Sequence, residues 1–173
     1  MKQFLSLLVL LLVVTACQNQ EKLGYIDRSV VINGYEKKVN IEQRFEVMNQ
    51  DFIKRRDSLI QAYELERTQA SVRAQSMTPQ QVQQLSQQFQ QKEAFIGQQI
   101  QAEQQQLQQA FDAEIDSVIM EVKEYVTTYG KANNYTFIFG TSDATNTVMF
   151  SSESNDISQT ILYQLNSDYK KTN

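Results

Sequence analysis

Apolar residues return at intervals of eleven over two long and otherwise polar stretches of the chain. In the second stretch one series runs from Leu85 to Val118 and another from Phe89 to Val122. In the first stretch two series keep the same interval: Ile41, Phe52, Tyr63 and Ala74, and Met48, Leu59 and Ala70. This interval corresponds to about 3.67 residues per turn, so each series stays on one face of a nearly straight helix. The pattern predicts two long helices that pack along each other as an antiparallel hairpin.

The break between the two helices is predicted at Thr78-Pro79. Pro79 is the only proline of the chain; it suits the first position of a helix, and the preceding threonine can cap that helix. We therefore expect helices over residues 28–75 and 79–130, which together form the arm, with its tip near residues 76–80. At about 1.5 Å per residue, helices of this length reach roughly 60–75 Å.

Glutamine dominates the region around the tip. Residues 75–109 contain 17 glutamines in 35 positions. Such a tract could be disordered and prone to aggregation. The apolar residues keep their helical spacing through it, however, and glutamine is a good helix former. A solvated helical surface is the favoured interpretation.

The residues on either side of the arm predict a small β-rich base. Three short segments alternate in character and contain β-branched or aromatic residues, as strands do: residues 23–27, 135–140 and 147–150. A final helix should open at Asn155 or Asp156. The chain is thus expected to be of the α+β class, with residues 23–27 and 131–169 forming the base. A base of this size buries too little apolar surface to be stable alone. We therefore expect the bases of several chains to associate.

The N-terminus has the features of an export signal. Lys2 is followed by an apolar run from Phe4 to Val14, which is shorter than the roughly 20 residues of a membrane-spanning helix. Residues 1–16 are therefore expected to be a signal peptide. Small residues precede Cys17 as in a lipobox, so we expect this cysteine to be lipidated and residues 17–22 to be a linker. An ordinary secretory peptide, with Cys17 as a free thiol, is the alternative.

Composition excludes several classes of function. The whole chain has a formal charge of −4, and removal of residues 1–16, with Lys2, changes this to −5. An acidic surface argues against nucleic-acid binding, which depends on neutralising phosphates. The chain has no histidine and one cysteine, so zinc sites of the Cys/His type cannot form. Carboxylate pairs such as Glu64 and Glu66 lie on polar helix faces, and we expect neither enzyme activity, nor a metal, nor a cofactor.

The order of the elements resembles a known family. Three segments carry the likeness: Leu23-Gly24-Tyr25-Ile26-Asp27, Tyr135-Thr136-Phe137-Ile138-Phe139-Gly140, and the C-terminal helix with Asp156-Ile157-Ser158, Ile161 and Leu165-Asn166. Together with the long polar hairpin, they are similar to the Skp/OmpH family of periplasmic chaperones for outer-membrane proteins. The likeness covers residues 23 to about 169.

The resemblance implies a homotrimer shaped like a jellyfish. Strands of the three bases would form a central barrel, and three hairpins would enclose a cavity for unfolded outer-membrane proteins. The best-known members are basic and soluble, whereas this chain is acidic and has the lipobox at Cys17. The resemblance and the lipobox together imply that the protein lies in the periplasm and is anchored to a membrane by lipid. The outer membrane is favoured because Gln18, rather than aspartate, follows the cysteine.

The expected mechanism is binding without ATP. Aromatic residues on the arms could make weak, exchangeable contacts with unfolded clients, and Phe45, Phe52 and Phe95 are the candidates. Phe89 and Phe111 are expected to pack within the hairpin instead. The alternative function is structural: a trimeric coiled-coil lipoprotein that spaces or tethers the layers of the envelope. A spacer would keep a continuous apolar seam, whereas here the series ends in small residues at the tip.

Overall fold

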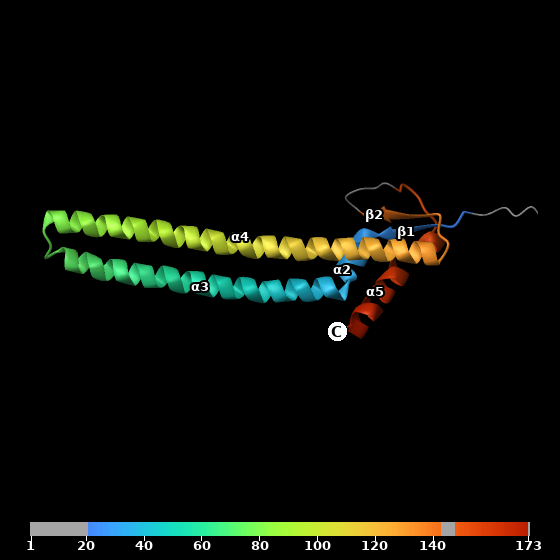
Figure 1. Cartoon of the computed structure of the whole chain (residues 1–173), viewed down its shortest axis with the longest axis horizontal. Coiled ribbons are helices and arrows are strands. Elements are labelled where there is room, and N and C mark those ends of the chain that lie inside the picture. Colours follow the sequence, from blue (N-terminus) through green and yellow to red (C-terminus); the bar gives the residue numbers. More distant parts are fainter. Residues whose placement is uncertain (1–20, 143–147, 173) are drawn as a thin grey trace, which may run out of the picture.

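The computed structural model describes residues 21–142 and 148–172 and consists of a long arm and a small base (Figure 1). The predicted signal peptide and Cys17 lie outside the described residues. The elements follow in this order: β1 (Leu23–Asp27), α2 (Arg28–Gly34), α3 (Glu36–Ala74), α4 (Pro79–Ala132), β2 (Phe137–Thr141), the 3-10 turn η1 (Glu153–Asn155) and α5 (Ser158–Thr172). The chain is therefore of the α+β class, as the sequence predicts.

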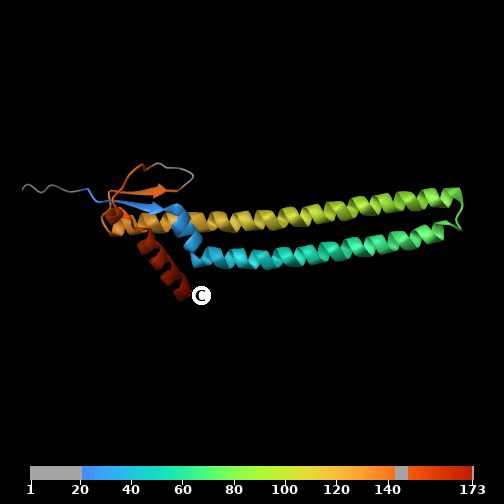
Figure 2. The ribbon, with the colours of Figure 1, turned by 180° about the vertical axis from the view of Figure 1, so that it is seen from behind.

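The arm is an antiparallel hairpin of α3 and α4, and both views show the two helices side by side along its length (Figures 1 and 2). The eleven-residue series line its interior. Phe52, Tyr63 and Ala70 on α3 are buried, and so are Ile96 and Val118 on α4. The periodicity therefore identifies the packed face, with one exception: Met48 lies at the edge of the interface and is 42% exposed.

Aromatic pairs and ion pairs fix the register of the hairpin. Phe45 packs edge-on against Phe111 with ring centroids 5.3 Å apart, and Tyr63 packs against Phe89 at 5.9 Å. The predicted packing of Phe89 and Phe111 within the hairpin is thus confirmed. Ion pairs also join the helices at the rim, among them Arg44 with Glu114, Arg55 with Glu103, and Lys92 with Glu66. Exposed pairs of this kind stabilise a fold by roughly 0–1 kcal/mol each, so the apolar interior supplies most of the hairpin's stability.

The tip of the arm is closed by a capping box. The backbone N–H of Gln81 donates to the Thr78 hydroxyl oxygen, and the Thr78 N–H donates to the Gln81 side-chain oxygen at 2.9 Å. Pro79 occupies the first turn of α4, where a missing N–H leaves no helical bond unmade. The glutamine-rich region continues as regular helix through α4.

One predicted helix is in fact two. The sequence predicts a continuous helix over residues 28–75, but the structure ends α2 at Gly34 and starts α3 at Glu36. Tyr35, between them, has extended backbone angles, with φ −71° and ψ 116°. Its ring is 2% exposed. The physical reason for the break is that the extended backbone turns this large side chain into the core of the base instead of along the arm.

The base contains a two-stranded parallel sheet. β1 pairs with β2 in a register that places Leu23 opposite Phe137 and Asp27 opposite Thr141. The sequence also predicts a third strand at residues 147–150, of which residue 147 lies outside the described residues. Within the described residues, 148–150 form no strand, so this prediction is wrong for a single chain. The side chains of Met149 and Phe150 are 91% and 88% exposed, so the segment does not pack as a strand on the sheet.

Helix α5 completes the base and returns toward the root of the arm (Figure 1). Asp156 accepts a 2.8 Å hydrogen bond from the backbone N–H of Ser158 and so caps the start of this helix, as expected. Ile161 on α5, Val31 on α2 and Val118 on α4 are fully buried in one cluster. The core of the molecule therefore lies where the base meets the root of the arm.

Candidate functional site

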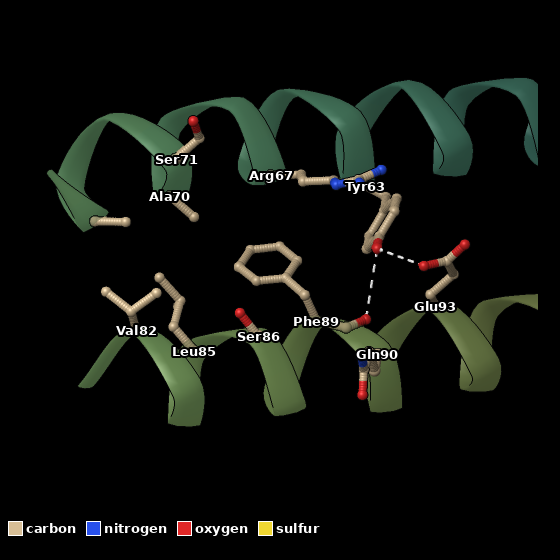
Figure 3. A pocket seen from close by; sticks show the side chains of 11 residues that line it. Tyr63, Arg67, Ala70, Ser71, Val82, Leu85, Ser86, Phe89, Gln90 and Glu93 are labelled. Atoms are coloured by element: carbon tan, nitrogen blue, oxygen red, sulfur yellow. Dashed lines mark hydrogen bonds between the residues drawn. The ribbon is translucent and has the colours of Figure 1, made fainter. Parts of the chain in front are cut away.

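A groove opens between the two helices near the tip of the arm. It has a volume of about 310 Å³. Its floor is apolar and its rim carries hydroxyl, amide and charged groups; it is lined by Tyr63, Arg67, Ala70, Ser71, Ala74, Val82, Leu85, Ser86, Phe89, Gln90 and Glu93. Figure 3 shows the Phe89 ring pointing into the space between the helices, opposite the small side chain of Ala70. The groove exists because the apolar series of α3 ends in alanines.

A hydrogen-bonded tyrosine bounds this groove on the side nearer the base. The Tyr63 hydroxyl lies 3.2 Å from a carboxylate oxygen of Glu93 and 3.4 Å from the Phe89 carbonyl oxygen, and both interactions are drawn in Figure 3. Burial, and then the hydrogen bond to Glu93, raises the pKa of Tyr63 above its ordinary value. The hydroxyl therefore stays protonated and donates to its partners over the physiological range.

The chain segment that forms the tip turn and the start of α4 carries no charge, although Arg67 and Glu93 lie at the rim of the groove. From Ala74 to Gln91 the chain has no ionisable side chain, and the nearest charges along the sequence are Arg73 and Lys92. The polar groups in this stretch are mostly side-chain amides and hydroxyls. Such groups can donate and accept hydrogen bonds, so the tip suits neutral polypeptide better than a charged ligand.

The three aromatic candidates for client contact are placed differently. Phe45 and Phe52 are buried inside the hairpin, at 7% and 4% exposure, whereas Phe95 is 64% exposed. Phe95 is therefore the member of the set that another molecule can reach without opening the hairpin. A role of these residues in binding remains a prediction.

Exposed apolar side chains also occur outside the eleven-residue series. Leu65, Val72 and Met120 are each more than 60% exposed on the outside of the arm. Sequence reasoning missed them because it followed the periodic, buried positions. They could have been predicted from the sequence by looking for apolar residues of the two helices that lie on none of the eleven-residue series.

The outer face of the small sheet is also apolar and open. Phe137 and Phe139 stack with ring centroids 5.9 Å apart and are about half-exposed. A hollow of about 640 Å³ lies beside Phe139 and is also lined by Leu23, Met149 and Phe150. Contiguous exposed apolar patches typically mark interaction sites. The base therefore presents a surface suited to another protein surface.

The root of the arm is held by a partly buried polar cluster. The Tyr35 hydroxyl donates to Glu121 at 2.7 Å, and Lys37 pairs with the same carboxylate. Burial and the bond to Glu121 raise the pKa of Tyr35. Burial alone would raise the pKa of Glu121, but the hydrogen bonds from Lys37 and Tyr35 hold it below its ordinary value. These shifts are explained by structural contacts, which do not require a catalytic role.

Over residues 21–142 and 148–172 no three or more potential ligand side chains gather where a metal ion could be held. None of the helices in those ranges has the length and hydropathy needed to cross a membrane. The surfaces that the structure places within reach of another molecule are the arm, its tip groove and the outer face of the sheet.

Comparison with known proteins agrees with this architecture. A solved structure from Caulobacter crescentus CB15, described as a candidate outer membrane chaperone (OmpH-like), superposes with a TM-score of 0.72 at 12% sequence identity, covering 89% of each chain. At that identity the likeness concerns the fold. A search of the curated proteins gave no match. Residues 22–165 match the family described as outer membrane protein (OmpH-like), and the chain belongs to this family.

Proposed function

We propose that the chain is an ATP-independent holdase chaperone for unfolded outer-membrane or other envelope proteins. Membership of the OmpH-like family supports this function. The single structural observation that carries it is an arm with exposed apolar side chains and an open groove near its tip. We assign it neither enzyme activity nor a cofactor.

A precursor of an outer-membrane barrel poses a physical problem that such an arm could solve. Its strands alternate apolar and polar side chains, and its backbone groups are satisfied only when the barrel closes. Until then the precursor aggregates in water. A holdase binds the unfolded state and lowers the concentration of free precursor by mass action, and this needs no energy source.

The contacts on the arm suit weak and reversible binding. Phe95, Leu65 and Val72 are exposed apolar side chains on a largely polar surface. The buried Phe45 and Phe52 would contribute only by stabilising the hairpin. Scattered apolar contacts each stabilise a complex by no more than about 1.5–3 kcal/mol when fully buried. A client would therefore be held by many exchangeable contacts and released without a separate step.

We further propose that three chains assemble through their bases, with the arms enclosing a cavity. The stacked Phe137 and Phe139, together with Met149 and Phe150, form the surface that assembly would cover. Assembly would also supply a partner strand for residues 148–150. The anchor is proposed to be lipid on Cys17, holding the protein in the periplasm at the membrane, with the outer membrane favoured.

The direct test is suppression of aggregation. A β-barrel protein unfolded in urea is diluted into buffer with or without the mature chain, and light scattering is followed. Scattering should fall to near background at about one trimer per client. Serum albumin at equal mass serves as the control for crowding. Undiminished scattering at a stoichiometric amount of trimer would exclude the proposed function.

A further inference from the structure

The break at Tyr35 is bridged by one side chain of the C-terminal helix. The Asn166 side-chain NH₂ donates to the Gly34 carbonyl oxygen at 3.1 Å, and its side-chain oxygen accepts from the Glu36 backbone N–H at 2.8 Å. Gly34 is the last residue of α2 and Glu36 the first of α3. A single planar amide thus joins the end of one helix to the start of the next.

The two groups that Asn166 binds are those that a helix break leaves without helical partners. The last carbonyls of α2 and the first N–H groups of α3 cannot bond within their own helices, and Tyr35, which precedes α3, provides no side-chain cap. Asparagine is suited to this position because its amide carries both an acceptor and donors. Aspartate would keep the acceptor and lose the donor.

Helix α5 contacts the beginning of α3 at two further points. Lys170 pairs with Glu36 at 2.7 Å, and the Asn40 side chain donates to the Tyr169 hydroxyl at 3.2 Å. The Tyr169 ring also packs edge-on against Tyr35 with centroids 5.9 Å apart. Figures 1 and 2 both show α5 running from the base to the root of α3. The C-terminal helix therefore braces the point where the arm joins the base.

The brace has a mechanical consequence for a hairpin of two rods. One rod, α4, runs without a break from the tip into the base, whereas α3 is separated from the base by the break at Tyr35. Two packed helices lie about 8–10 Å apart, so bending the pair by roughly 20° requires them to slide past each other by about 3 Å. The turn at Thr78 joins them at the tip. Sliding must therefore be taken up at the root.

We infer that Asn166 is a positioning residue that locks α3 against lengthwise sliding and so sets the stiffness of the arm. A slide of α3 by about 3 Å exceeds what a hydrogen bond of normal length tolerates, so the bond that Asn166 accepts from Glu36 must break for the arm to bend that far. The role of this stiffness in the cell rests on the proposed function, because stiff arms would keep the size of the client cavity constant. The lock itself is a property of the chain without a client.

The test measures the distance between the two helices on either side of the break. Spin labels are attached at Asn33→Cys on α2 and Gln50→Cys on α3, both exposed, in the mature chain with Cys17→Ser. An excess of unlabelled chain is added so that distances between subunits are suppressed. Double electron–electron resonance then reports sliding, because a displacement of α3 relative to α2 changes the distance between the labels.

The background with an intact Asn166 should give one narrow distance distribution, and Asn166→Ala should broaden or shift it by about 3 Å. Hydrogen exchange of the Glu36 amide should become about fivefold faster, because the loss of a bond of about 1 kcal/mol shifts the opening equilibrium by that factor. Gln164→Ala is the matched control: it removes a side-chain oxygen of the same helix that accepts a 3.0 Å hydrogen bond from the Tyr125 hydroxyl on α4, and it should leave the distribution unchanged.

Two outcomes would overturn the inference. One is an Asn166→Ala chain of normal helicity whose distance distribution coincides with that of the parent. If that variant unfolds, Asn166→Leu decides, because leucine is similar in shape to asparagine and removes both bonds. An unchanged distribution there would count against the lock equally. Neither measurement involves a client, so a failure of the lock and a failure of the chaperone function are told apart.

Discussion

The Tyr35 hydroxyl donates a 2.7 Å hydrogen bond to the Glu121 carboxylate and so ties the break between α2 and α3 to the continuous helix α4. The tyrosine ring is almost completely buried, and Lys37 occupies the other oxygen of the same carboxylate. The bond joins residues that are 86 positions apart in the sequence. It is therefore a tertiary contact that fixes the root of the arm.

Removing this hydroxyl should destabilise the base measurably. Tyr35→Phe keeps the ring in the core and deletes the donor, and we expect a loss of about 1–2 kcal/mol in the free energy of unfolding. Tyr35→Ala also removes the ring and should cost about 3–5 kcal/mol. Urea denaturation followed by circular dichroism measures both. Equal stability of the parent and the phenylalanine variant would show that the bond contributes nothing.

The depressed pKa of Glu121 predicts an acid-sensitive root. Because the folded state lowers this pKa below its ordinary value of 4.5, the ionised carboxylate stabilises the folded protein fully above pH 4.5. This stabilisation is lost as the pH falls through the lower, folded pKa. The melting temperature should therefore drop more steeply on acidification in the parent than in Glu121→Gln. Parallel curves for the two proteins would contradict the assignment.

The buried tyrosine predicts the opposite dependence at high pH. Folding raises the Tyr35 pKa above 10.0. The protonated hydroxyl therefore stabilises the folded protein fully below pH 10, and this stabilisation is lost as the pH rises toward the folded pKa. Tyr35→Phe should lose part of the alkaline destabilisation seen in the parent. Thermal melts between about pH 8 and 11, with Tyr163→Phe as an exposed control, measure the difference.

Two phenylalanines of the arm should separate stability from binding. Phe52→Ala empties a buried position of the hairpin and should cost about 3–5 kcal/mol. Phe95→Ser changes an exposed position, so stability should shift by no more than about 0.5 kcal/mol, while suppression of client aggregation weakens. Unfolding and light scattering on the same preparations give both values. Full activity of Phe95→Ser would remove that residue from the client surface.

The exposed loop of the base should matter for assembly and little for the fold of one chain. Met149 and Phe150 are almost fully exposed, so Phe150→Glu should leave the helicity of the chain unchanged. If this surface lies between copies, the buried charge would oppose association. Sedimentation equilibrium should then show a shift to smaller species. Ser154→Glu, an exposed change on the nearby turn η1, is the control.

The sequence predicts the hairpin well for a physical reason. Tyr63 and Phe89 both lie on series whose spacing matches the turn of a straight helix, so local pattern and tertiary packing agree for this pair. Phe111 also lies on a series, whereas its partner Phe45 does not. The capping box at Thr78 has its own local signature and is equally predictable. These features need no knowledge of distant contacts.

The features that the sequence does not predict depend on distant partners. The break at Tyr35 is stabilised by Glu121 and Asn166, which belong to other helices, and nothing in the local spacing marks it. Residues 148–150 have the composition of a strand, but a strand requires a neighbour to satisfy its backbone groups. Phe52 is buried and lies on an eleven-residue series, whereas Phe95 is exposed and lies on none. The spacing therefore accounts for the burial of the first residue and the exposure of the second.

The neutral stretch from Ala74 to Gln91 separates two kinds of chemistry along one arm. Ion pairs such as Arg44 with Glu114 lie toward the root, and interactions between exposed charges weaken as ionic strength rises. Amide and apolar contacts at the far end are not screened in this way. A protein gripped by the outermost part of the arm would thus be retained about equally well in dilute and in concentrated salt, whatever the charge of that protein.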